Sequence, residues 1–434
     1  MAHPRLAVNR PRDTGAGSPV VRLAVFGAGS RGRAYGAWVA AHPERARVVM
    51  VAEPDADRRQ AYAEVHGLPP EACFETWEDC LASGQVADAV LVCLQDNNHV
   101  QPTLRALAHG MHVLLEKPMA PTEEECRQVA AAAHASGLIF GVCHVLRYTP
   151  YTRRLRELLS SGAVGDPVSV EHLEPVGWWH HAHSYVRGSW SKTAESGPML
   201  LAKGCHDIDW LQYVMGDRIA QVSSFGRNTH FVPANAPTGA TEGCLDCPLN
   251  QQCAYSATRI YLDEYRDGDP LTWPRDVLTS KPTRLALEEA LARGPYGRCV
   301  YGGGNDVVDH QVVALEFVGG ATGTFTMTAF TPKEDRKTRI FGTQGYLDGD
   351  GHTIRHVDFR TGRERHYSVN APGPMDAGGG HAGGDAGLMD AFVGAVASGD
   401  QSVLSSDAGE SLSSHVAVFA AERARQLRTV EQVS

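Results

Sequence analysis

Residues 21–32, with the sequence VRLAVFGAGSRG, decide the fold of the N-terminal part of the chain. The apolar run over residues 21–26 is typical of a strand buried in a parallel sheet, and helix-like sequence follows it. Its glycines form a G-x-G-x-x-G motif: the first permits a tight turn, the second lets a pyrophosphate approach, and the third lets the helix pack closely. The stretch therefore predicts a Rossmann domain that binds a dinucleotide. The expected contacts are Gly27, Gly29, Ser30, Arg31 and Gly32.

An acidic residue follows the second apolar run. Glu53 directly follows the run of residues 48–52 and lies 21 positions after Gly32. An acid at this place can accept hydrogen bonds from the adenosine ribose hydroxyls and would repel a 2′-phosphate, so it favours NAD over NADP. Arg31 and Arg58 are nearby cations, which leave NADP open as the alternative.

The composition narrows the class of protein. A chain of 434 residues leads us to expect two domains, and a net charge of −10 argues against a nucleic-acid partner. No apolar run reaches membrane-spanning length, so we expect no membrane partner. Residues 1–20 lack the apolar region of a secretory signal and are expected to form a disordered tail. Ten cysteines in such a chain favour the reducing cytoplasm over a disulfide scaffold.

Two further apolar runs are expected to be strands with polar exits, residues 89–94 and 112–115. Ligands of doubly wound sheets lie beyond the carboxyl ends of the strands, so these exits are expected near the cofactor. Ordinary turn and cap chemistry is the alternative for the asparagines, and simple solvation is the alternative for the lysine. The candidate cofactor contacts are Asn97, Asn98, His99, Glu116 and Lys117.

The glycine motif, Glu53, the exit that ends in His99 and the tripeptide Glu116-Lys117-Pro118 together resemble the Gfo/Idh/MocA oxidoreductases. The resemblance covers nearly the whole chain after residue 20. It implies an N-terminal Rossmann domain, placed at residues 21–145, and a C-terminal α/β domain with an open, mostly antiparallel sheet, placed at residues 146–434. It also implies hydride exchange at a sugar or polyol carbon, and a homodimer or homotetramer.

The second half of the chain carries strand signals of its own. Residues 322–330 alternate threonines with larger apolar side chains, and Gly319-Gly320 before them is a hairpin signal. We also expect strands at 168–174, 312–318, 337–341 and 353–359, and a helix from about 407 to 427. The segment 378–387, GGGHAGGDAG, is too glycine-rich for regular structure. It is expected to be a flexible loop or, alternatively, a loop that brings His381 and Asp385 to the substrate.

Residues 177–209 hold the densest group of polar and aromatic side chains. The sequence of residues 177–190 is GWWHHAHSYVRGSW. Polar groups beside aromatic rings are costly to bury without a function, so we expect a substrate pocket, although the tryptophans could also be core residues. The candidate substrate contacts are Arg147, His180, His183, Arg187, Trp190 and Asp209, and His183, Tyr185 and Lys203 are candidate acid–base groups.

His206 is the strongest candidate for the acid–base group. Removal of a hydride from a carbinol needs a base for the hydroxyl proton, and histidine titrates near neutral pH. The resemblance implies that a histidine in a D-x-G-x-H arrangement acts together with the lysine of the Glu-Lys-Pro tripeptide, here Lys117. The chain has Gly204 and His206, but Ala202 stands in place of the aspartate. Another group must therefore orient His206, or the chemistry differs.

The predicted pocket is rich in cationic side chains. These are Arg147, His180, His183, Arg187, Lys203 and His206. Since the planar guanidinium of arginine suits carboxylate, sulfonate and phosphate groups, we hypothesise a substrate with an anionic group.

Four cysteines have the spacing of a structural metal site. Cys244, Cys247 and Cys253 form C-x2-C-x5-C, and Cys299 follows. This pattern predicts a closed tetrathiolate zinc site, with free thiols as the alternative. Such a site would stabilise the fold of a polar, proline-rich insertion over residues 227–300.

Two enzymatic readings follow, and a non-catalytic regulator is a third. The first is an NAD-dependent oxidoreductase that transfers hydride at a ring carbon of a sugar or sugar derivative. The second is a redox-neutral, NAD-dependent glycoside hydrolase that acts on an anionic sugar glycoside such as a sulfoquinovoside or uronide. In that reading a ring hydroxyl is oxidised, the glycosidic bond is eliminated, water adds and the hydride returns.

Overall fold

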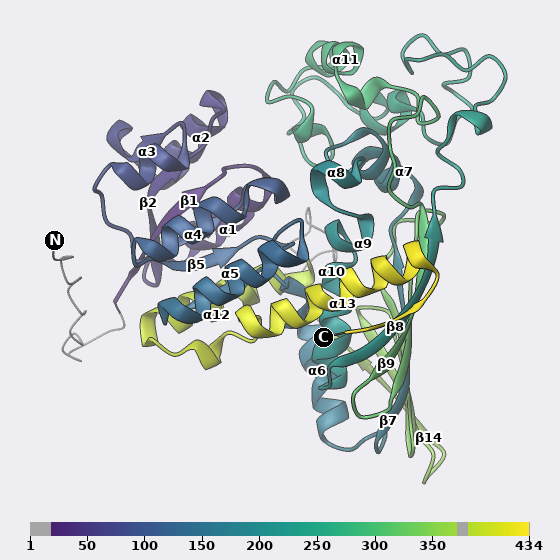
Figure 1. The fold of residues 1–434 in the computed structure, drawn as a ribbon. Coiled ribbons are helices and arrows are strands. Elements are labelled where there is room, and N and C mark those ends of the chain that lie inside the picture. Colours follow the sequence, from purple (N-terminus) through teal and green to yellow (C-terminus); the bar gives the residue numbers. More distant parts are fainter. Residues whose placement is uncertain (1–18, 371–380, 434) are drawn as a thin grey trace.

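A six-stranded parallel sheet forms the N-terminal half of the structure, a computed structural model that describes residues 19–370 and 381–433 (Figure 1). The strand order β3-β2-β1-β4-β5-β6 places β1 near the centre, between β2 and β4. This is the order of a Rossmann sheet, and it confirms the fold predicted from the glycine motif. The strands are β1 (Val21–Phe26), β2 (Ala46–Ala52), β3 (Cys73–Phe74), β4 (Ala89–Val92), β5 (His112–Leu115) and β6 (Phe140–Val142).

Burial on both faces explains the continuous apolar sequence of these strands. All four residues of β4 are buried, as are five of the six residues of β1. Short polar side chains start several of the connecting helices: Asp55 and Thr122, for example, accept hydrogen bonds from first-turn backbone N–H groups. The helices are α1 (Ser30–Ala41), α2 (Ala56–His66), α3 (Trp77–Ala82), α4 (Val100–Ala108) and α5 (Glu123–Ser136).

A nine-stranded sheet forms the second half, in the order β14-β13-β12-β11-β7-β10-β9-β8-β15. Neighbouring strands are antiparallel except for the parallel pair of β7 and β10, which confirms the expected mostly antiparallel sheet. The predicted turn at Gly319-Gly320 joins β9 to β10. The strands are β7 (Pro167–Pro175), β8 (Ile219–Arg227), β9 (His310–Phe317), β10 (Thr322–Thr328), β11 (Lys337–Gly342), β12 (Gly345–Gly349), β13 (Thr353–Asp358), β14 (Arg363–Ser368) and β15 (Val430–Gln432).

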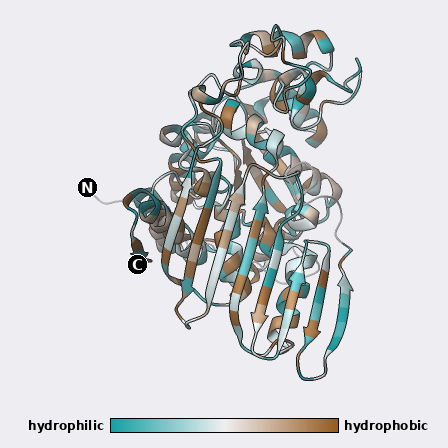
Figure 2. Ribbon diagram, turned by 90° about the vertical axis from the view of Figure 1, so that its right-hand side faces the viewer, coloured by the Kyte–Doolittle hydropathy of each residue, from teal (hydrophilic) through white to brown (hydrophobic). Residues whose placement is uncertain are grey.

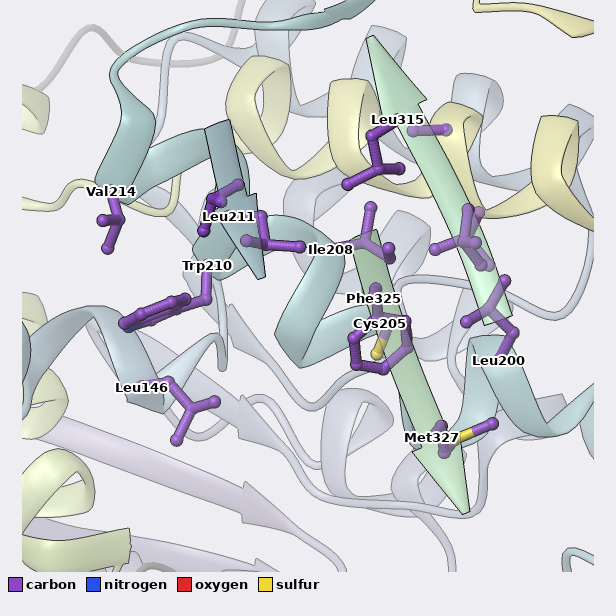
Figure 3. Close-up of a cluster of buried hydrophobic side chains, with 14 of the residues drawn as sticks. Leu146, Leu200, Cys205, Ile208, Trp210, Leu211, Val214, Leu315, Phe325 and Met327 are labelled. Carbon is purple, nitrogen blue, oxygen red and sulfur yellow. The ribbon is translucent and has the colours of Figure 1, made fainter. Parts of the chain in front are cut away.

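Helices cover one face of the nine-stranded sheet, and Figure 2 shows the other face turned to the viewer without a covering layer. The covering helices include α6 (Pro150–Ser160), α9 (Met199–Ala202) and α10 (Cys205–Met215). The core between α10 and the sheet is apolar: Ile208 of α10 lies in one cluster with Phe325 and Met327 of β10 (Figure 3). This packing fixes the first turn of α10, which carries His206.

Two C-terminal helices connect the halves. α12 (Gly384–Ser398) returns to the Rossmann domain, where Leu388 and Phe392 pack in the same cluster as Val25 of β1. α13 (Ala408–Leu427), yellow in Figure 1, runs from the Rossmann domain to β8. It begins after Asp407, whose side chain accepts a hydrogen bond from the N–H of Glu410, as expected for this helix.

The glycine-rich segment differs in part from its prediction. α12 already begins at Gly384, inside the segment 378–387 that was expected to be irregular. Burial of the apolar face of the helix against the Rossmann domain outweighs the low helix propensity of its glycines. Residues 378–380 lie outside the described residues, as do residues 1–18 of the expected N-terminal tail.

An insertion of residues 228–309 joins β8 to β9, which are antiparallel neighbours. It forms the body at the upper right of Figure 1, and its longest helix is α11 (Arg284–Arg293). Tyr261 and Leu287 belong to a small apolar cluster of its own. Across the described residues, no helix has both the length and the apolar character that crossing a bilayer requires.

Candidate active site

A cavity of about 280 Å³ lies where the glycine loop, the exits of β4 and β5, the segment after β7 and the insertion meet. Residues from all of these parts line it, including Gly29, Lys117, Trp190, His206 and Trp273. The carboxyl ends of the parallel strands therefore face the region rich in histidine and tryptophan, as is usual for ligand sites of doubly wound sheets.

The three glycines of the motif meet different surroundings. A Cβ on Gly27, whose φ is 94°, would lie 2.4 Å from the carbonyl oxygen of Cys93, and one on Gly32 would lie 2.0 Å from that of Gly27. A Cβ on Gly29 would meet no atom of the described residues within 4 Å. Open space at Gly29, which lines the cavity beside the start of α1, fits the pyrophosphate of a dinucleotide.

Glu53 holds the glycine loop in place. Its Oε2 accepts a hydrogen bond of 2.7 Å from the backbone N–H of Ala28, and its Oε1 accepts one of 3.1 Å from that of Asp55. The side chain is buried. Arg58, in the first turn of α2, lines the cavity.

Arg31 links three segments that are distant in sequence. Its guanidinium lies 2.8 Å from Glu116 and 2.7 Å from Asp385, which also contacts His381 at 2.9 Å. Burial alone would raise the pKa of Glu116, but the neighbouring cations Arg31 and Lys117 lower it, so this carboxylate is ionised. The network anchors the start of α12 to the cofactor side of the cavity.

The exit of β4 is organised differently from the prediction. Asn97 and Asn98 are exposed, whereas His99 is buried, with ring nitrogens 2.7 Å from the carbonyl oxygen of Pro118 and 3.1 Å from that of Leu94. His99 therefore ties the β4 exit to the tripeptide after β5. The polar residues of this exit that line the cavity are Gln95 and Asp96.

Asp96 is a cavity residue that had not been assigned a role from the sequence. It is buried and accepts a hydrogen bond of 2.9 Å from the indole N–H of Trp190. Burial raises the pKa of its carboxyl, and nearby Lys117 opposes this increase. An aspartate among other turn-forming residues carries little signal in sequence, because such residues are common in ordinary turns.

Lys117 and His206 line the same cavity. The Nζ of Lys117 donates a hydrogen bond of 2.8 Å to the carbonyl oxygen of Ala202. Burial holds the pKa of His206 well below its ordinary value, and the charge of Lys117 lowers it further. The Nδ1 of His206 is buried and has no hydrogen-bond partner among residues 19–370 and 381–433. A neutral imidazole beside a lysine can accept a proton from a substrate hydroxyl.

Charged side chains of the second domain form a network beside the cavity. Lys203 lies 3.1 Å from Glu174, and Arg336 lies 2.8 Å from the same carboxylate and also pairs with Asp207. Lys203 and Arg336 line the cavity. Arg336 was not among the residues predicted from the sequence, because it lies far along the chain without a motif around it. His172 completes the network, 3.0 Å from Asp207.

Histidine and aromatic rings form another wall of the cavity. The ring of His183 stacks on Tyr296 at 4.8 Å and its Nδ1 lies 2.6 Å from the hydroxyl of Tyr261. Burial and then Arg187 lower the pKa of His183 to about 3, so the ring is neutral. The other members of this wall are His180, Tyr185, Trp190 and Trp273.

Three residues predicted to contact substrate lie outside this cavity. Arg147 and Asp209 form a buried pair with two hydrogen bonds of 2.7 Å. Arg187 donates to the backbone carbonyl oxygens of Arg298 and Tyr255, at 2.7 Å each. These guanidinium groups are engaged within the protein, which sequence spacing does not reveal.

The predicted zinc site gains no support. Cys244, Cys247, Cys253 and Cys299 are free thiols that line one small cavity together with Arg187. Within residues 19–370 and 381–433, no three metal-ligating side chains come together in a way that could hold an ion. The thiol of Cys244 instead accepts a hydrogen bond of 3.3 Å from Arg187.

Comparison with known proteins agrees with both halves of the structure. The profile of the GFO_IDH_MocA family described as "Oxidoreductase family, NAD-binding Rossmann fold" matches residues 21–144, and the profile of its "C-terminal alpha/beta domain" matches residues 156–431. A 2,7-anhydro-N-acetylneuraminate hydratase of Mediterraneibacter gnavus is 27% identical over 268 residues, which cover 62% of this chain and 67% of the hydratase.

Solved structures share the whole fold. An oxidoreductase domain protein from Kribbella flavida superposes with a TM-score of 0.70 at 21% identity, covering 96% of this chain and 100% of the other. Levoglucosan dehydrogenase in complex with NADH gives a TM-score of 0.69 at 17% identity, with the same coverage.

Proposed function

We propose a function for this chain from the premise that it belongs to the Gfo/Idh/MocA oxidoreductase family, with an NAD-binding Rossmann domain. The function is NAD-dependent hydride exchange at a ring carbon of a sugar or sugar derivative. The observation that carries the proposal is the presence of Lys117, His206 and Asp96 in one cavity with the glycine loop. Levoglucosan dehydrogenase, a protein of the same fold, binds NADH, which supports NAD as the cofactor.

Different side chains of the cavity have different roles in such a reaction. Bound NAD would supply the hydride acceptor, held by the backbone around Gly29 at the start of α1. The neutral ring of His206 takes the hydroxyl proton, and the Lys117 ammonium stabilises negative charge on the substrate oxygen. The carbonyl oxygen of Ala202 aligns Lys117 by accepting its hydrogen bond.

A redox-neutral glycoside hydrolase is the second candidate. Such a cycle needs a separate acid or base for elimination and for the addition of water, beyond the group that takes the first proton. Asp96, with its raised pKa, and His206 are two candidates in one cavity. The hydratase relative also supports this candidate, since a hydratase by its name adds water.

An anionic sugar, such as a sulfoquinovoside or uronide, remains the proposed substrate class. Fewer cationic side chains support this substrate class than the sequence suggests, because Arg147 and Arg187 do not line the cavity. Lys203 and Arg336 remain at the cavity, although Glu174 and Asp207 balance their charges. Comparison of kcat/KM for matched neutral and anionic sugars tests the point: equal values would exclude an anionic preference.

One experiment separates net oxidation from the redox-neutral cycle. The protein is incubated with a small amount of NAD and a panel of sugars and glycosides, while NADH absorbance and released aglycone are followed. A dehydrogenase forms NADH in proportion to product. A hydrolase releases aglycone over many turnovers with no net NADH. Absence of both signals across the panel counts against both candidates.

We also propose a cytoplasmic homodimer or homotetramer. One face of the nine-stranded sheet is uncovered in the single chain (Figure 2). Phe225 and Val312 of this sheet are cross-strand neighbours, and both side chains are exposed. Burial of such apolar side chains favours association. Light scattering of the purified protein tests this proposal, and a monomer at micromolar concentration would contradict it.

A further inference from the structure

We propose that Asp276, from the insertion between β8 and β9, accepts a hydrogen bond from the adenosine 2′-hydroxyl of NAD and excludes the 2′-phosphate of NADP. The inference rests on the NAD dependence proposed above. It assigns part of the cofactor site to a segment more than two hundred residues away from the glycine motif in sequence.

The insertion docks on the Rossmann domain at the cofactor side. The carboxylate of Asp276, in the single turn Arg275–Val277, lies 2.6 Å from the guanidinium of Arg33 on α1. The hydroxyl of Ser280 lies 3.5 Å from the carboxylate of Asp57 on α2. These contacts place Asp276 against the helices that follow β1 and β2, the two strands whose exits meet an adenosine ribose in this fold.

One oxygen of Asp276 has no partner within the part of the chain that the structure describes. Oδ2 is occupied by Arg33, whereas Oδ1 is buried and has no hydrogen-bond donor in the structure. A buried carboxylate oxygen without a donor costs free energy, and such a group often marks a ligand site. Asp276 lines the same cavity as Gly29, Ser30 and Arg58, so the missing donor can come from a molecule in that cavity.

The neighbouring groups identify the donor. Glu53 is the acid expected at the ribose, but each of its carboxylate oxygens already accepts a hydrogen bond from a backbone N–H group. Glu53 is also not among the described residues that line the cavity. Asp276, unlike Glu53, is a carboxylate that lines the cavity, together with Arg33 and Arg58. A ribose hydroxyl bound over the glycine loop supplies the O–H donor that this oxygen lacks.

The same geometry excludes a phosphate. Arg33 and Arg58 alone would form a favourable site for a 2′-phosphate. Asp276 pairs with Arg33 and adds a negative charge at the place where the phosphate would bind, so two like charges would meet in a partly buried site. Arg33 and Arg58 alone would favour NADP. With Asp276 of the insertion beside them, the same site favours NAD.

Direct binding measurements test this assignment. Cofactor-free protein is titrated calorimetrically with NAD, 2′-deoxy-NAD and NADP, for the wild type, Asp276→Asn, Asp276→Ala and Glu288→Gln. The last variant is the matched control: it removes an acidic charge from an exposed ion pair with Arg284 on the same insertion. Thermal melting without cofactor checks that each variant is folded.

In the wild type, NAD should bind at least about tenfold more tightly than 2′-deoxy-NAD, because a hydrogen bond to a charged group is lost. In Asp276→Ala this preference should disappear. In both Asp276 variants the preference for NAD over NADP should fall by about tenfold or more, whereas Glu288→Gln should keep the wild-type values. Asp276→Asn alone decides the NADP comparison if the alanine variant does not fold.

Unchanged preferences in the Asp276 variants would overturn the assignment while leaving the proposed function intact. A wild-type protein that binds neither NAD nor NADP would instead overturn the proposed function. A wild-type protein that prefers NADP would overturn the selective role of Asp276.

Discussion

The ammonium group of Lys117 donates a hydrogen bond of 2.8 Å to the backbone carbonyl oxygen of Ala202, the residue that stands where related sequences are expected to have an aspartate. A backbone carbonyl can orient the lysine, but it carries no charge and cannot exchange a proton. Asp96 is a carboxylate that reaches the same cavity from the exit of β4 and interacts electrostatically with Lys117.

Lys117→Met should lower kcat by about 10²- to 10⁴-fold, because the variant loses the charge that stabilises the substrate oxygen and aligns the proton transfer. Turnover of any sugar that the wild type accepts measures the effect, and calorimetry with NAD should show affinity within about threefold of the wild type. Lys281→Met is the control: this lysine of the insertion is not among the described residues that line the cavity, so the variant should keep full activity. Wild-type kcat in Lys117→Met would remove Lys117 from the reaction.

The activity should persist at mildly acidic pH. His206 acts as a base only when neutral, and burial followed by the charge of Lys117 places its pKa well below 6.5. Because a lowered pKa keeps the base form at lower pH, kcat/KM should stay nearly constant between about pH 7.5 and 6. A half-maximal value near pH 6.5 would show a solvated histidine and contradict this geometry. His206→Gln should lower kcat about 10²-fold or more across the whole range.

Trp190→Phe tests whether Asp96 takes part as an ionised group. The indole N–H stabilises the carboxylate through a hydrogen bond of 2.9 Å. Its removal should raise the pKa of Asp96, so the acid limb of kcat/KM should move to higher pH by about half a unit or more. Asp96→Asn should abolish that limb and lower kcat. An acid limb that stays in place in Trp190→Phe would assign it to another group.

Substitution of two glycines should separate cofactor binding from folding. Alanine at position 29 places a methyl group in open space, so the melting temperature should stay near that of the wild type while NAD affinity falls at least about tenfold. Alanine at position 32 would meet the carbonyl oxygen of Gly27 at 2.0 Å and should cost about 1–3 kcal/mol of stability. Thermal melting and calorimetry measure both effects. A Gly29→Ala variant with wild-type NAD affinity would contradict a pyrophosphate at this loop.

The Arg147–Asp209 pair should contribute to stability, with no direct role at the substrate. Arg147→Met leaves Asp209 buried without its main partner and should cost about 3–5 kcal/mol. Arg284→Ala removes one side of an exposed pair and should cost less than about 1 kcal/mol. Urea unfolding measures both changes. A large rise in KM for the sugar with unchanged stability in Arg147→Met would restore a substrate-binding role.

The fold could be predicted from the sequence because local signals and packing agree. The run VRLAVF became β1 with its predicted bounds, and the alternation over residues 322–330 became β10. Both patterns report which faces of a strand are buried: a continuous apolar run fits a strand buried on both faces, and alternation fits a sheet with two different faces. The strand β14 was not predicted, since five of its six side chains are exposed and no apolar alternation marks it.

Less of the candidate site could be predicted from the sequence, because its contacts join segments that are distant along the chain. Lys117 and His206 reach one cavity, but Arg147 and Arg187, equally cationic in sequence, are engaged inside the protein. Arg336 and Asp276 carry no motif. A charge in sequence does not show its partner, and only the packed structure decides whether a guanidinium faces a cavity or a carboxylate.

The two ends of the insertion meet: the backbone N–H of Asp309 donates to the carbonyl oxygen of Arg227 at 3.1 Å. A segment whose ends close at the tip of a strand pair can be lengthened, shortened or exchanged while the register of the sheet is kept. The same segment supplies both Trp273 and Asp276 to the lining of one cavity. In the function proposed above, a single replacement of this segment would change the accepted sugar and the preferred cofactor in one step, which makes the segment a unit for grafting between relatives.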